Sequence, residues 1–509
     1  MIDNLISGFA ISLSFSNLLV CLLGCTLGTI IGVLPGLGPA ATISILLMLT
    51  YKMNLTSAII MLSGIYYGAQ YGGTITSVLF RLPGEASTVV TIFDGYQMAL
   101  QGRGGKALGI AAYGSFFAGT LGTIALSILA PPLAKVAIMF GPPEYSALMC
   151  LGLTLVIYLG SGSVVKGVIM GAVGLALSTI GMDPVTAFER FNFGSQTLVE
   201  GVNMAVLAMG LFGIGEILYM AGSPESRSRR DAAKCPTKLR ELLPDKKEIK
   251  ASAGAIGRGS ILGFFLGILP GGGATIASFV SYAFEKRISR HPETFGKGEI
   301  VGVAAPESAN NAAVSGCFIP LLTLGIPANV VMALLMGAFI LHGVIPGPFI
   351  LEKHPDVFWG LITSMYIGNV ILLILNIPFI RLFVKFMEVP YALLSPMIIV
   401  ICTIGAYSLN YNPVEVSIMF IFGIAGYLLK KLDYEVAPLM LAFVLGELFE
   451  KSVRQSLILS RGSPLIFLSR PISAILLGIA LVMILSPLFA FLIKRSRSVS
   501  VPYKGTESR

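Results

Sequence analysis

Two turns rich in proline and glycine interrupt long apolar stretches and carry residue types that bind small ions. They read GTIIGVLPGLGPAATIS and LGFFLGILPGGGATIAS. Proline lacks a backbone donor and glycine relaxes the backbone, so such a turn frees carbonyl groups for a cation and presents N–H groups to a carboxylate. The alternative is a packing kink, since both residues are common in membrane helices. Because the turns recur at corresponding positions, we favour a binding function.

The turns and the hydroxyl groups that follow them supply the first candidate residues. We expect a carboxylate substrate to contact Gly36, Gly38, Thr42, Ser44, Gly271, Gly272, Gly273 and Thr275. The prolines that open the turns, Pro35 and Pro270, free the carbonyl groups that we assign to cation coupling.

The densest polar patch inside an apolar region reads GVAAPESANNAAVSG. A carboxylate at the centre of a bilayer costs at least ~2.5 kcal/mol, so Glu307 needs a partner or a water-filled cavity. Amide side chains can donate to a substrate carboxylate or accept a cation. We therefore predict that Ser308, Asn310 and Asn311 bind substrate and that Glu307 and Asn310 couple cations. Hydrogen bonding between helices is the structural alternative.

A comparable polar region in the first half reads YYGAQYGGTITSVLFRLPGEASTVVTIFDGYQMALQGRGGKALG. Its polar side chains include Tyr67, Gln70, Tyr71, Thr74, Thr76, Ser87 and Thr88. Arg81 is expected to form an ion pair with Glu85, and bidentate contact with an anionic substrate is the alternative. The DGYQMALQGRGGK stretch, which begins at Asp94, is expected to be an exposed connection with solvated side chains.

No enzyme motif accompanies these residues. GRGGKA around Lys106 lacks the earlier Gly and the Ser or Thr of a phosphate-binding loop, and neither HExxH nor GxSxG occurs. His291, His342 and His354 lack the spacing of metal ligands, and the 6 cysteines form no CxxC pair. We therefore predict no catalysis, no metal site and no cofactor, the only added species being a coupling ion, Na⁺ or H⁺.

The chain that carries these motifs has 509 residues, of which 55% are hydrophobic and only 12% are charged. Average globular proteins contain about 25% charged residues. Apolar runs long enough to cross a bilayer recur throughout, so we predict an all-α polytopic membrane protein with about twelve transmembrane helices plus re-entrant or broken helices. The net charge of +9 is clustered between apolar segments, which indicates membrane topology rather than nucleic-acid binding.

The two turns belong to repeated halves that a basic segment separates. We predict a first membrane repeat over residues 1–221, a basic cytoplasmic linker over 222–256, a second membrane repeat over 257–470, and a C-terminal helix with a basic cytoplasmic tail over 471–509. Basic residues prefer the cytoplasmic side, so the N-terminus is expected outside and the C-terminus inside. The halves then enter the membrane from opposite sides, which predicts inverted repeats. Basic residues on both sides of the second turn predict a helical hairpin there.

Several motifs together resemble one transporter family. They are PGLGPAA, YYGAQYGGTITSVLF, LPGEASTVVTIFDGYQMALQG, PGGGATIASFVSYAFEK, FGKGEIVGVAAPESANNAAVSG and LGIPANVVMALLMGAFILHGVIPGP. Over about residues 15–350 the chain resembles the large membrane subunit, TctA type, of tripartite tricarboxylate transporters. The resemblance implies a permease of the bacterial inner membrane. It also implies ion-coupled uptake of carboxylates, with a small membrane subunit and a periplasmic solute-binding protein as partners.

The chain departs from the commonest pattern of this family at three positions. Arg81 stands where a small polar residue is usual, Ser308 where Ala is usual, and Ala328 where Gly is usual. An added positive charge near a substrate path could alter substrate preference, so the substrate need not be citrate.

Transport energetics favour coupling to cations. Bringing a trianion into a cell held 100 mV negative costs about 7 kcal/mol, so cations must accompany it, and Na⁺ is the favoured ion. We therefore expect a binding-protein-dependent secondary transporter of tricarboxylates or related carboxylates. A stand-alone secondary carboxylate carrier is one alternative. An alternative from another class is a membrane-embedded enzyme acting on lipid-linked substrates, for which paired acidic residues or a metal cluster would be expected.

Overall fold

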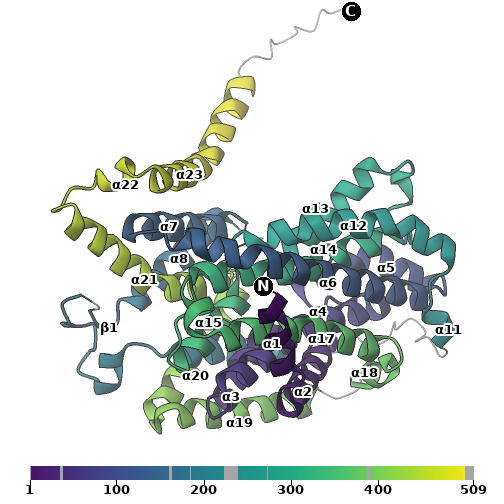
Figure 1. The fold of residues 1–509 in the computed structure, drawn as a ribbon, viewed down its shortest axis with the longest axis horizontal. Coiled ribbons are helices and arrows are strands. Elements are labelled where there is room, and N and C mark those ends of the chain that lie inside the picture. The colour runs from purple at the N-terminus through teal and green to yellow at the C-terminus, as the bar shows by residue number, and fades with distance from the viewer. Residues whose placement is uncertain are drawn as a thin grey trace, which may run out of the picture.

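The computed structural model is almost entirely helical (Figure 1). It describes residues 2–34, 38–159, 163–183, 185–222, 239–271, 273–386 and 391–498. Within these ranges the only strands are β1 (Gly181–Met182) and β2 (Glu189–Arg190), which pair antiparallel. The prediction of an all-α fold is therefore confirmed. Most of the basic linker, residues 223–238, lies outside the described residues.

The chain folds into a long succession of helices. Before residue 223 they are α1 (Ile2–Ser12), α2 (Phe15–Val33), α3 (Pro39–Thr50), α4 (Leu55–Phe80), η1 (Ala86–Thr88), α5 (Thr91–Leu100), α6 (Gly104–Ala137), α7 (Pro142–Leu159), α8 (Val164–Ser178), η2 (Gln196–Glu200), α9 (Met204–Ala208), η3 (Met209–Ile214) and α10 (Gly215–Gly222). After residue 238 they are α11 (Leu239–Leu242), α12 (Lys246–Ile268), α13 (Gly273–Ile288), η5 (Pro292–Thr294), α14 (Val301–Leu324), α15 (Val330–Leu341), α16 (Ile350–Lys353), α17 (Pro355–Asn376), α18 (Ile380–Phe386), α19 (Tyr391–Asn410), α20 (Pro413–Lys431), α21 (Ala437–Leu459), α22 (Ile466–Ser469) and α23 (Pro471–Ser498).

In the described part of the chain, 6 helical segments are long and apolar enough to cross a membrane. They are α2, α6, the continuous segment α9–η3–α10, α12, α17 and α20. Shorter apolar helices accompany them: α3, α8, α15, and the parts of α19 and α23 over Ser395–Asn410 and Pro471–Leu485. A multi-pass helical membrane protein is confirmed, whereas the count of about twelve spans stays a prediction.

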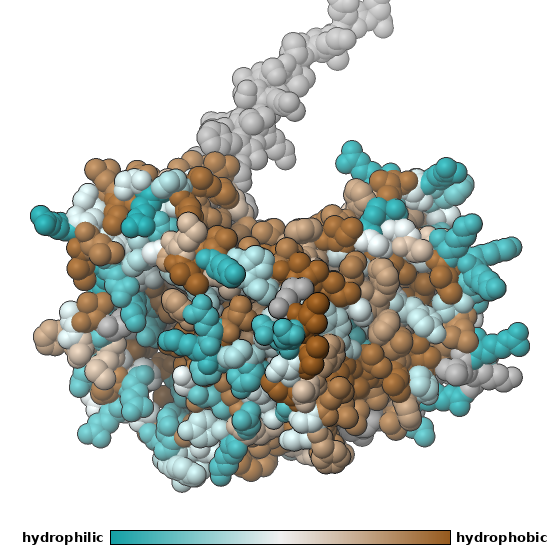
Figure 2. Space-filling model, in the orientation of Figure 1, coloured by the Kyte–Doolittle hydropathy of each residue, from teal (hydrophilic) through white to brown (hydrophobic). Residues whose placement is uncertain are grey.

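Apolar side chains cover much of the face shown in Figure 2, and hydrophilic side chains are dense at its right edge and scattered over its left half. Large exposed apolar residues occur on many helices, for example Phe15 at 83% and Val482 at 68% exposure. Soluble monomers rarely expose apolar patches above a few hundred Å². The surface therefore has the character expected of one that contacts lipid.

Two helices form the centre of the molecule. Every residue of α4 from Thr56 to Leu79 and every residue of α14 from Gly302 to Thr323 is buried. These central helices are not uniformly apolar, because they carry the polar residues of the two regions identified in the sequence. Their polar side chains must therefore find partners, or bind ligands, inside the protein.

Stripes of small residues bring α2 against α4 and α12 against α14. An ideal Cβ at Gly28 would lie 2.4 Å from the carbonyl oxygen of Ile65, and one at Gly263 would lie 2.1 Å from that of Ala309. Such contacts are closer than any side chain allows. The stripes repeat every four residues, as Gly24, Gly28, Gly32 on α2 and Gly259, Gly263, Gly267 on α12. This is the small-residue spacing of packed membrane helices. The spacing is visible in the sequence, but the packing of these helix pairs was not among the predictions.

The predicted hairpin at the second glycine-rich turn is present. Helices α12 and α13 pack against each other on either side of residues 269–272. Far from the turn, the guanidinium of Arg258 donates to both carboxylate oxygens of Glu285, each at 2.7 Å. In Figure 1 this hairpin lies at the end of the molecule opposite the β1–β2 hairpin.

The expectation that the stretch from Asp94 is solvated is wrong at its first residue. Asp94 lies in α5 and is fully buried. Its Oδ1 accepts from the backbone N–H groups of Gly296, Gly298 and Glu299 at 2.8–2.9 Å, and its Oδ2 accepts from the hydroxyl of Tyr282 at 2.9 Å. Asp94 therefore fastens α5 to the loop that precedes α14. Its partners are more than 180 residues away in sequence, so no local pattern predicts them.

Helices from the two halves of the chain pack reciprocally. Helix α6 packs along α14, and α17 packs along both α4 and α6. Farther along the chain, α21 packs on α8, while α20 packs on η3 and α10. Each half thus supplies helices that cover the central helices of the other half.

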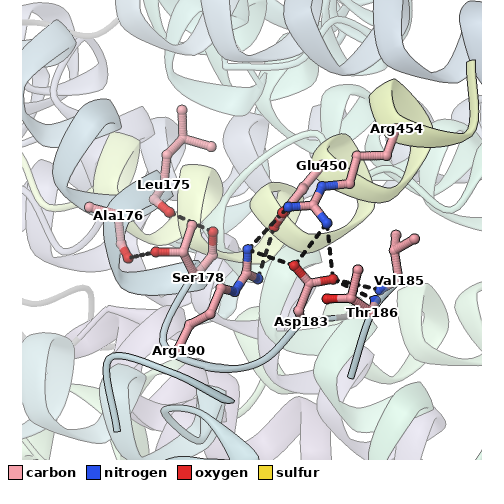
Figure 3. Close-up of polar contacts among 10 residues, drawn as sticks. Leu175, Ala176, Ser178, Asp183, Val185, Thr186, Arg190, Glu450 and Arg454 are labelled. Carbon is pink, nitrogen blue, oxygen red and sulfur yellow. Dashed lines mark hydrogen bonds and ion pairs between the residues drawn. The ribbon is translucent and has the colours of Figure 1, made fainter. Parts of the chain in front are cut away.

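The segment between α8 and α9 is held by a network of four charged side chains, shown in Figure 3. Asp183 accepts from the backbone N–H groups of Val185 and Thr186 and from the guanidinium of Arg454 at 2.8 Å. Arg190 lies 3.3 Å from the same carboxylate and donates twice to Glu450, at 2.8 and 3.1 Å. The network ties the β1–β2 hairpin to α21.

The network predicts a pH dependence of stability. Hydrogen bonds from the backbone of Thr186 and Val185, followed by the Arg454 guanidinium, hold the pKa of Asp183 well below its usual range. A depressed folded-state pKa contributes stability that is fully present above the unfolded pKa of about 3.9 and is lost as the pH falls toward the folded value. The melting temperature of Asp183→Asn should therefore lie below that of the wild type by a constant amount between pH 6 and pH 8. The difference in melting temperature between the two proteins should become smaller below about pH 4.

Thermal unfolding in detergent at several pH values tests this. Glu352→Gln, at an exposed carboxylate, is the matched control and should change the melting temperature little. Equal melting temperatures of wild type and Asp183→Asn at pH 7 would contradict the role of the network.

Candidate functional site

A polar cluster lies where the central helices α4 and α14 meet η1 and α5. At its centre is Glu307, whose side chain is buried with 1% of the residue exposed. Its Oε2 accepts from the hydroxyl of Thr74 at 2.7 Å, and its Oε1 accepts from the hydroxyl of Thr91. No ion pair in the described part of the chain involves Glu307. A buried carboxylate without a cationic partner is costly, so the site is suited to a cation or a proton.

Asn310 lies one helical turn beyond Glu307 on α14. It is fully buried, yet neither its amide nitrogen nor its amide oxygen has a hydrogen-bond partner among the described residues. An amide offers two donor hydrogens and an acceptor oxygen, and leaving such groups unpaired costs about 1–3 kcal/mol each. A ligand that pairs with them would recover this free energy.

Three further unpaired groups lie close to the cluster. Gln70, one turn before Thr74 on α4, accepts from the hydroxyl of Ser87 at 2.7 Å, and its amide nitrogen has no partner within the ranges described. The hydroxyl of Tyr71 and Oε2 of Glu85 likewise lack partners there. Unpaired donors and acceptors thus flank the contact between Thr74 and Glu307 on both central helices.

A cavity of about 10 Å³, roughly the size of one water, adjoins the cluster. It is lined by Tyr71 and Thr74 of α4, Ser115 of α6 and Asn376 of α17. The amide oxygen of Asn376 and the hydroxyl of Tyr71 have no partner in the described part of the protein. This small cavity next to the Glu307 site is lined mostly by apolar residues, and its few polar groups give room and partners for one water molecule.

Two of the predicted substrate residues on α14 have partners within the protein. The amide nitrogen of Asn311 donates to the hydroxyl of Ser115 at 2.7 Å and to the carbonyl of Glu307 at 3.0 Å. Ser308 donates to the carbonyl of Ala304 at 2.7 Å. The structure therefore gives Asn311 and Ser308 positioning contacts and leaves the amide of Asn310 open.

The residues of the first glycine-rich turn bond locally. Thr42 donates to the carbonyl of Gly38 at 3.2 Å, and Ser44 donates to that of Ala41 at 2.7 Å. Pro35 and Gly36 lie outside the described residues, as does Gly272 of the second turn. No hydrogen bond in the described residues joins Thr42 or Ser44 to Glu307.

The second turn meets the turn that follows α14. The N–H of Gly271, next to Pro270, donates to the carbonyl of Ala328 at 2.7 Å. Gly273 begins α13 with a φ of +39°, and a side chain there would approach Asn329. Asn329 caps α15 and donates to the hydroxyl of Tyr66 at 3.0 Å. Thr275 is half-buried on α13.

Sequence reasoning was wrong about Arg81 and overlooked three polar residues at or near the candidate site. No ion pair between Arg81 and Glu85 forms in the described structure. Arg81 is exposed at the end of α4, with its guanidinium carbon 6.0 Å from the ring centre of Tyr96. The overlooked residues are Thr91, Ser115 and Asn329, whose polar character inside apolar segments was the only available signal.

Comparisons with known proteins identify the family. The sequence model of the family described as "Tripartite tricarboxylate transporter TctA family" matches residues 18–441. An uncharacterized 52.8 kDa protein from the TAR-I ttuC′ 3′ region of Agrobacterium vitis is 50% identical over 481 residues, which cover 94% of this chain and 95% of that protein. An uncharacterized protein from the TAR-II ttuC′ 3′ region of the same organism is 53% identical over 223 residues, 44% of this chain and 92% of that protein.

No solved structure matches the chain. The matched family is one of transporters, so the prediction that the chain is not an enzyme is confirmed. Since the family model covers most of the sequence, the protein belongs to the tripartite tricarboxylate transporter TctA family.

Proposed function

We propose that this chain is the permease subunit that carries a tricarboxylate or related carboxylate across the bacterial inner membrane together with cations. In this proposal a periplasmic solute-binding protein delivers the substrate and a small membrane subunit completes the permease. Family membership supports a membrane component of tricarboxylate transport. The identities of the substrate, the coupling ion and the two partner proteins are what we add to it as a proposal.

The observation that carries the proposal is the unpaired amide of Asn310 in the buried cluster. Its N–H groups can donate to a substrate carboxylate, as can the unpaired amide nitrogen of Gln70. Two donors on facing central helices would hold one carboxylate of the substrate. We propose that Gly38, Gly271 and Thr275, at the two glycine-rich turns, also contact the substrate.

Cation coupling follows from the sign of the charge on Glu307. A carboxylate beside an anionic substrate repels it, and the threonine hydroxyls that bind Glu307 do not neutralise it. A bound Na⁺ or a proton on Glu307 would remove the repulsion, so substrate binding and cation binding would favour each other. We propose Na⁺ as the coupling ion and H⁺ as the alternative.

We further propose that the halves over residues 1–221 and 257–470 are inverted repeats. The equivalent close contacts of α2 with α4 and of α12 with α14 support this, as does the reciprocal packing of α6 on α14 and α17 on α4. The basic residues of the 222–256 linker and the 471–509 tail favour the cytoplasmic side for both, with the N-terminus outside.

Uptake into proteoliposomes tests the proposed function. Vesicles would contain the full chain with its small partner, and labelled citrate and a panel of di- and monocarboxylates would be offered with and without the binding protein. Accumulation that needs both an inward Na⁺ gradient and the binding protein is the expected result. Accumulation without the binding protein would favour the stand-alone carrier. No accumulation of any carboxylate under Na⁺ or H⁺ gradients would overturn the proposal.

A further inference from the structure

A second polar site lies far along the chain from the Glu307 cluster. It is a pocket of about 430 Å³ between the η2 segment, the start of α9 and the junction of α19 with α20. Its lining includes the carboxylates of Glu200 and Glu415, the amides of Asn203, Asn410 and Asn412, and the hydroxyl of Thr197. Among the described residues, no basic side chain lines it.

The carboxylate of Glu415 is unusually placed. The residue is only 3% exposed, and although its Oε1 accepts from the amide nitrogen of Asn410 at 2.7 Å, its Oε2 has no partner among the residues described. Neither Glu415 nor Glu200 takes part in an ion pair in the described part of the chain. A buried carboxylate oxygen of this kind is costly unless a positive charge or a donor reaches it.

The first turn of α20 supplies part of the positive charge that would balance these carboxylates. Glu415 lies in that turn, and a helix N-terminus is equivalent to about half a positive charge. Two carboxylates therefore leave roughly one and a half negative charges, which one divalent cation covers in full and one monovalent cation does not. A monovalent ion would leave about half a negative charge, whereas a divalent ion would neutralise both carboxylates with about half a positive charge to spare.

We propose that this pocket binds one hydrated divalent cation, Mg²⁺ or Ca²⁺, between Glu200 and Glu415. Carboxylate and amide oxygens are the ligands that these hard cations prefer. The described residues contain no group of three or more His, Cys, Asp or Glu side chains that could hold a metal, so water must complete the coordination shell. The pocket is much larger than a bare ion, which leaves room for those waters. Mg²⁺ in particular keeps several waters when one or two carboxylates bind it.

The walls of the pocket are fixed by bonds within the protein. Asn412 donates to the hydroxyl of Thr197 at 2.8 Å and accepts from the N–H of Val414 at 2.9 Å. Asn203 caps α9 by accepting from the N–H of Ala205 at 2.9 Å. The segment that begins with α9 ends at Gly222, where the basic linker starts, so the pocket faces outward in the proposed topology. The site goes beyond the transport function, because cation binding there requires neither substrate nor partner.

Thermal unfolding and calorimetric titration of the purified full chain in detergent test the proposal. Mg²⁺ or Ca²⁺ should raise the melting temperature saturably at constant ionic strength, with one ion bound per chain and an affinity in the range of about 10⁻⁴–10⁻³ M. Na⁺ added at the same concentration of positive charge should not raise the melting temperature. Glu415→Gln and Glu200→Gln should each weaken divalent binding at least tenfold.

Matched controls separate loss of the site from loss of the fold. Without divalent ions Glu415→Gln should melt no lower than the wild type, because a neutral amide needs no counter-charge. Glu447→Gln changes an exposed carboxylate that lines a neighbouring pocket instead, and it should bind the divalent ion as the wild type does. Unaltered binding by Glu415→Gln, an equal response to Na⁺, or no saturable binding would each overturn the proposal.

Discussion

Asn310→Ala is expected to reduce carboxylate uptake in proteoliposomes to background while the protein folds as well as the wild type. The amide of Asn310 makes no bond within the described part of the protein, so its removal breaks none there and deletes two unpaired buried groups. The melting temperature should therefore stay level or rise. A hydrogen bond to a charged group is worth about 1.5–3 kcal/mol, and losing one such bond to substrate slows uptake at least tenfold.

The neighbouring Asn311→Ala provides the contrast. Asn311 bonds to Ser115 and to the carbonyl of Glu307, so truncation leaves a buried hydroxyl without its donor and should lower stability by about 1–3 kcal/mol. Ser315→Ala on the same helix loses only a weak bond of 3.5 Å to Gly119 and should transport normally. Wild-type uptake by Asn310→Ala would remove Asn310 from the substrate site.

Gly263→Ala is expected to prevent folding or to destabilise the protein by more than about 3 kcal/mol, at or beyond the upper end of overpacking effects. The added Cβ would lie 2.1 Å from the carbonyl oxygen and 2.6 Å from the Cα of Ala309, and both are backbone atoms that cannot rotate away. The α12–α14 pair would have to separate. The yield of monodisperse protein and its melting temperature in detergent measure the effect.

Gly257→Ala in the same helix is the matched control. A Cβ at Gly257 meets no described atom within 4 Å, so the substitution should stabilise α12 by about 0.5–1 kcal/mol through backbone entropy alone. If both variants melt at the same temperature, the close contact between α12 and α14 is not needed for the fold.

Much of the architecture followed from hydropathy and composition. A low charge content and repeated apolar runs of about 20 residues indicate a helical membrane protein, because a helix satisfies all of its own backbone groups in lipid. The α12–α13 hairpin followed from basic residues on both sides of one turn. Glu307 and Asn310 stood out since polar residues in an apolar segment need partners or ligands. The glycine stripes are also visible in the sequence, because spacing along a helix is a local property.

Contacts between residues far apart in the chain could not be predicted from the sequence. Asn310 and Asn311 are adjacent amides with the same local signal, yet only Asn311 finds Ser115, which lies 196 residues away. Asp94 was expected in solvent and instead binds three backbone N–H groups about 200 residues further on. Arg81 and Glu85 are close in sequence but lie in different environments, because α4 ends at Phe80 and the chain turns at Arg81, whose φ is +56°.

The sequence by itself therefore determined the fold class, the family resemblance and the entry of the polar segment around Glu307 and Asn310 into the interior. These depend on residue type and on spacing within one helix or turn. Only the tertiary structure decided which of those polar groups are satisfied and which remain open to a ligand, and that Glu415 and Glu200 share a pocket. The reason is physical: a hydrogen bond or a charge pair needs two groups within about 3–4 Å, and which helices bring them there is fixed by packing of the whole chain.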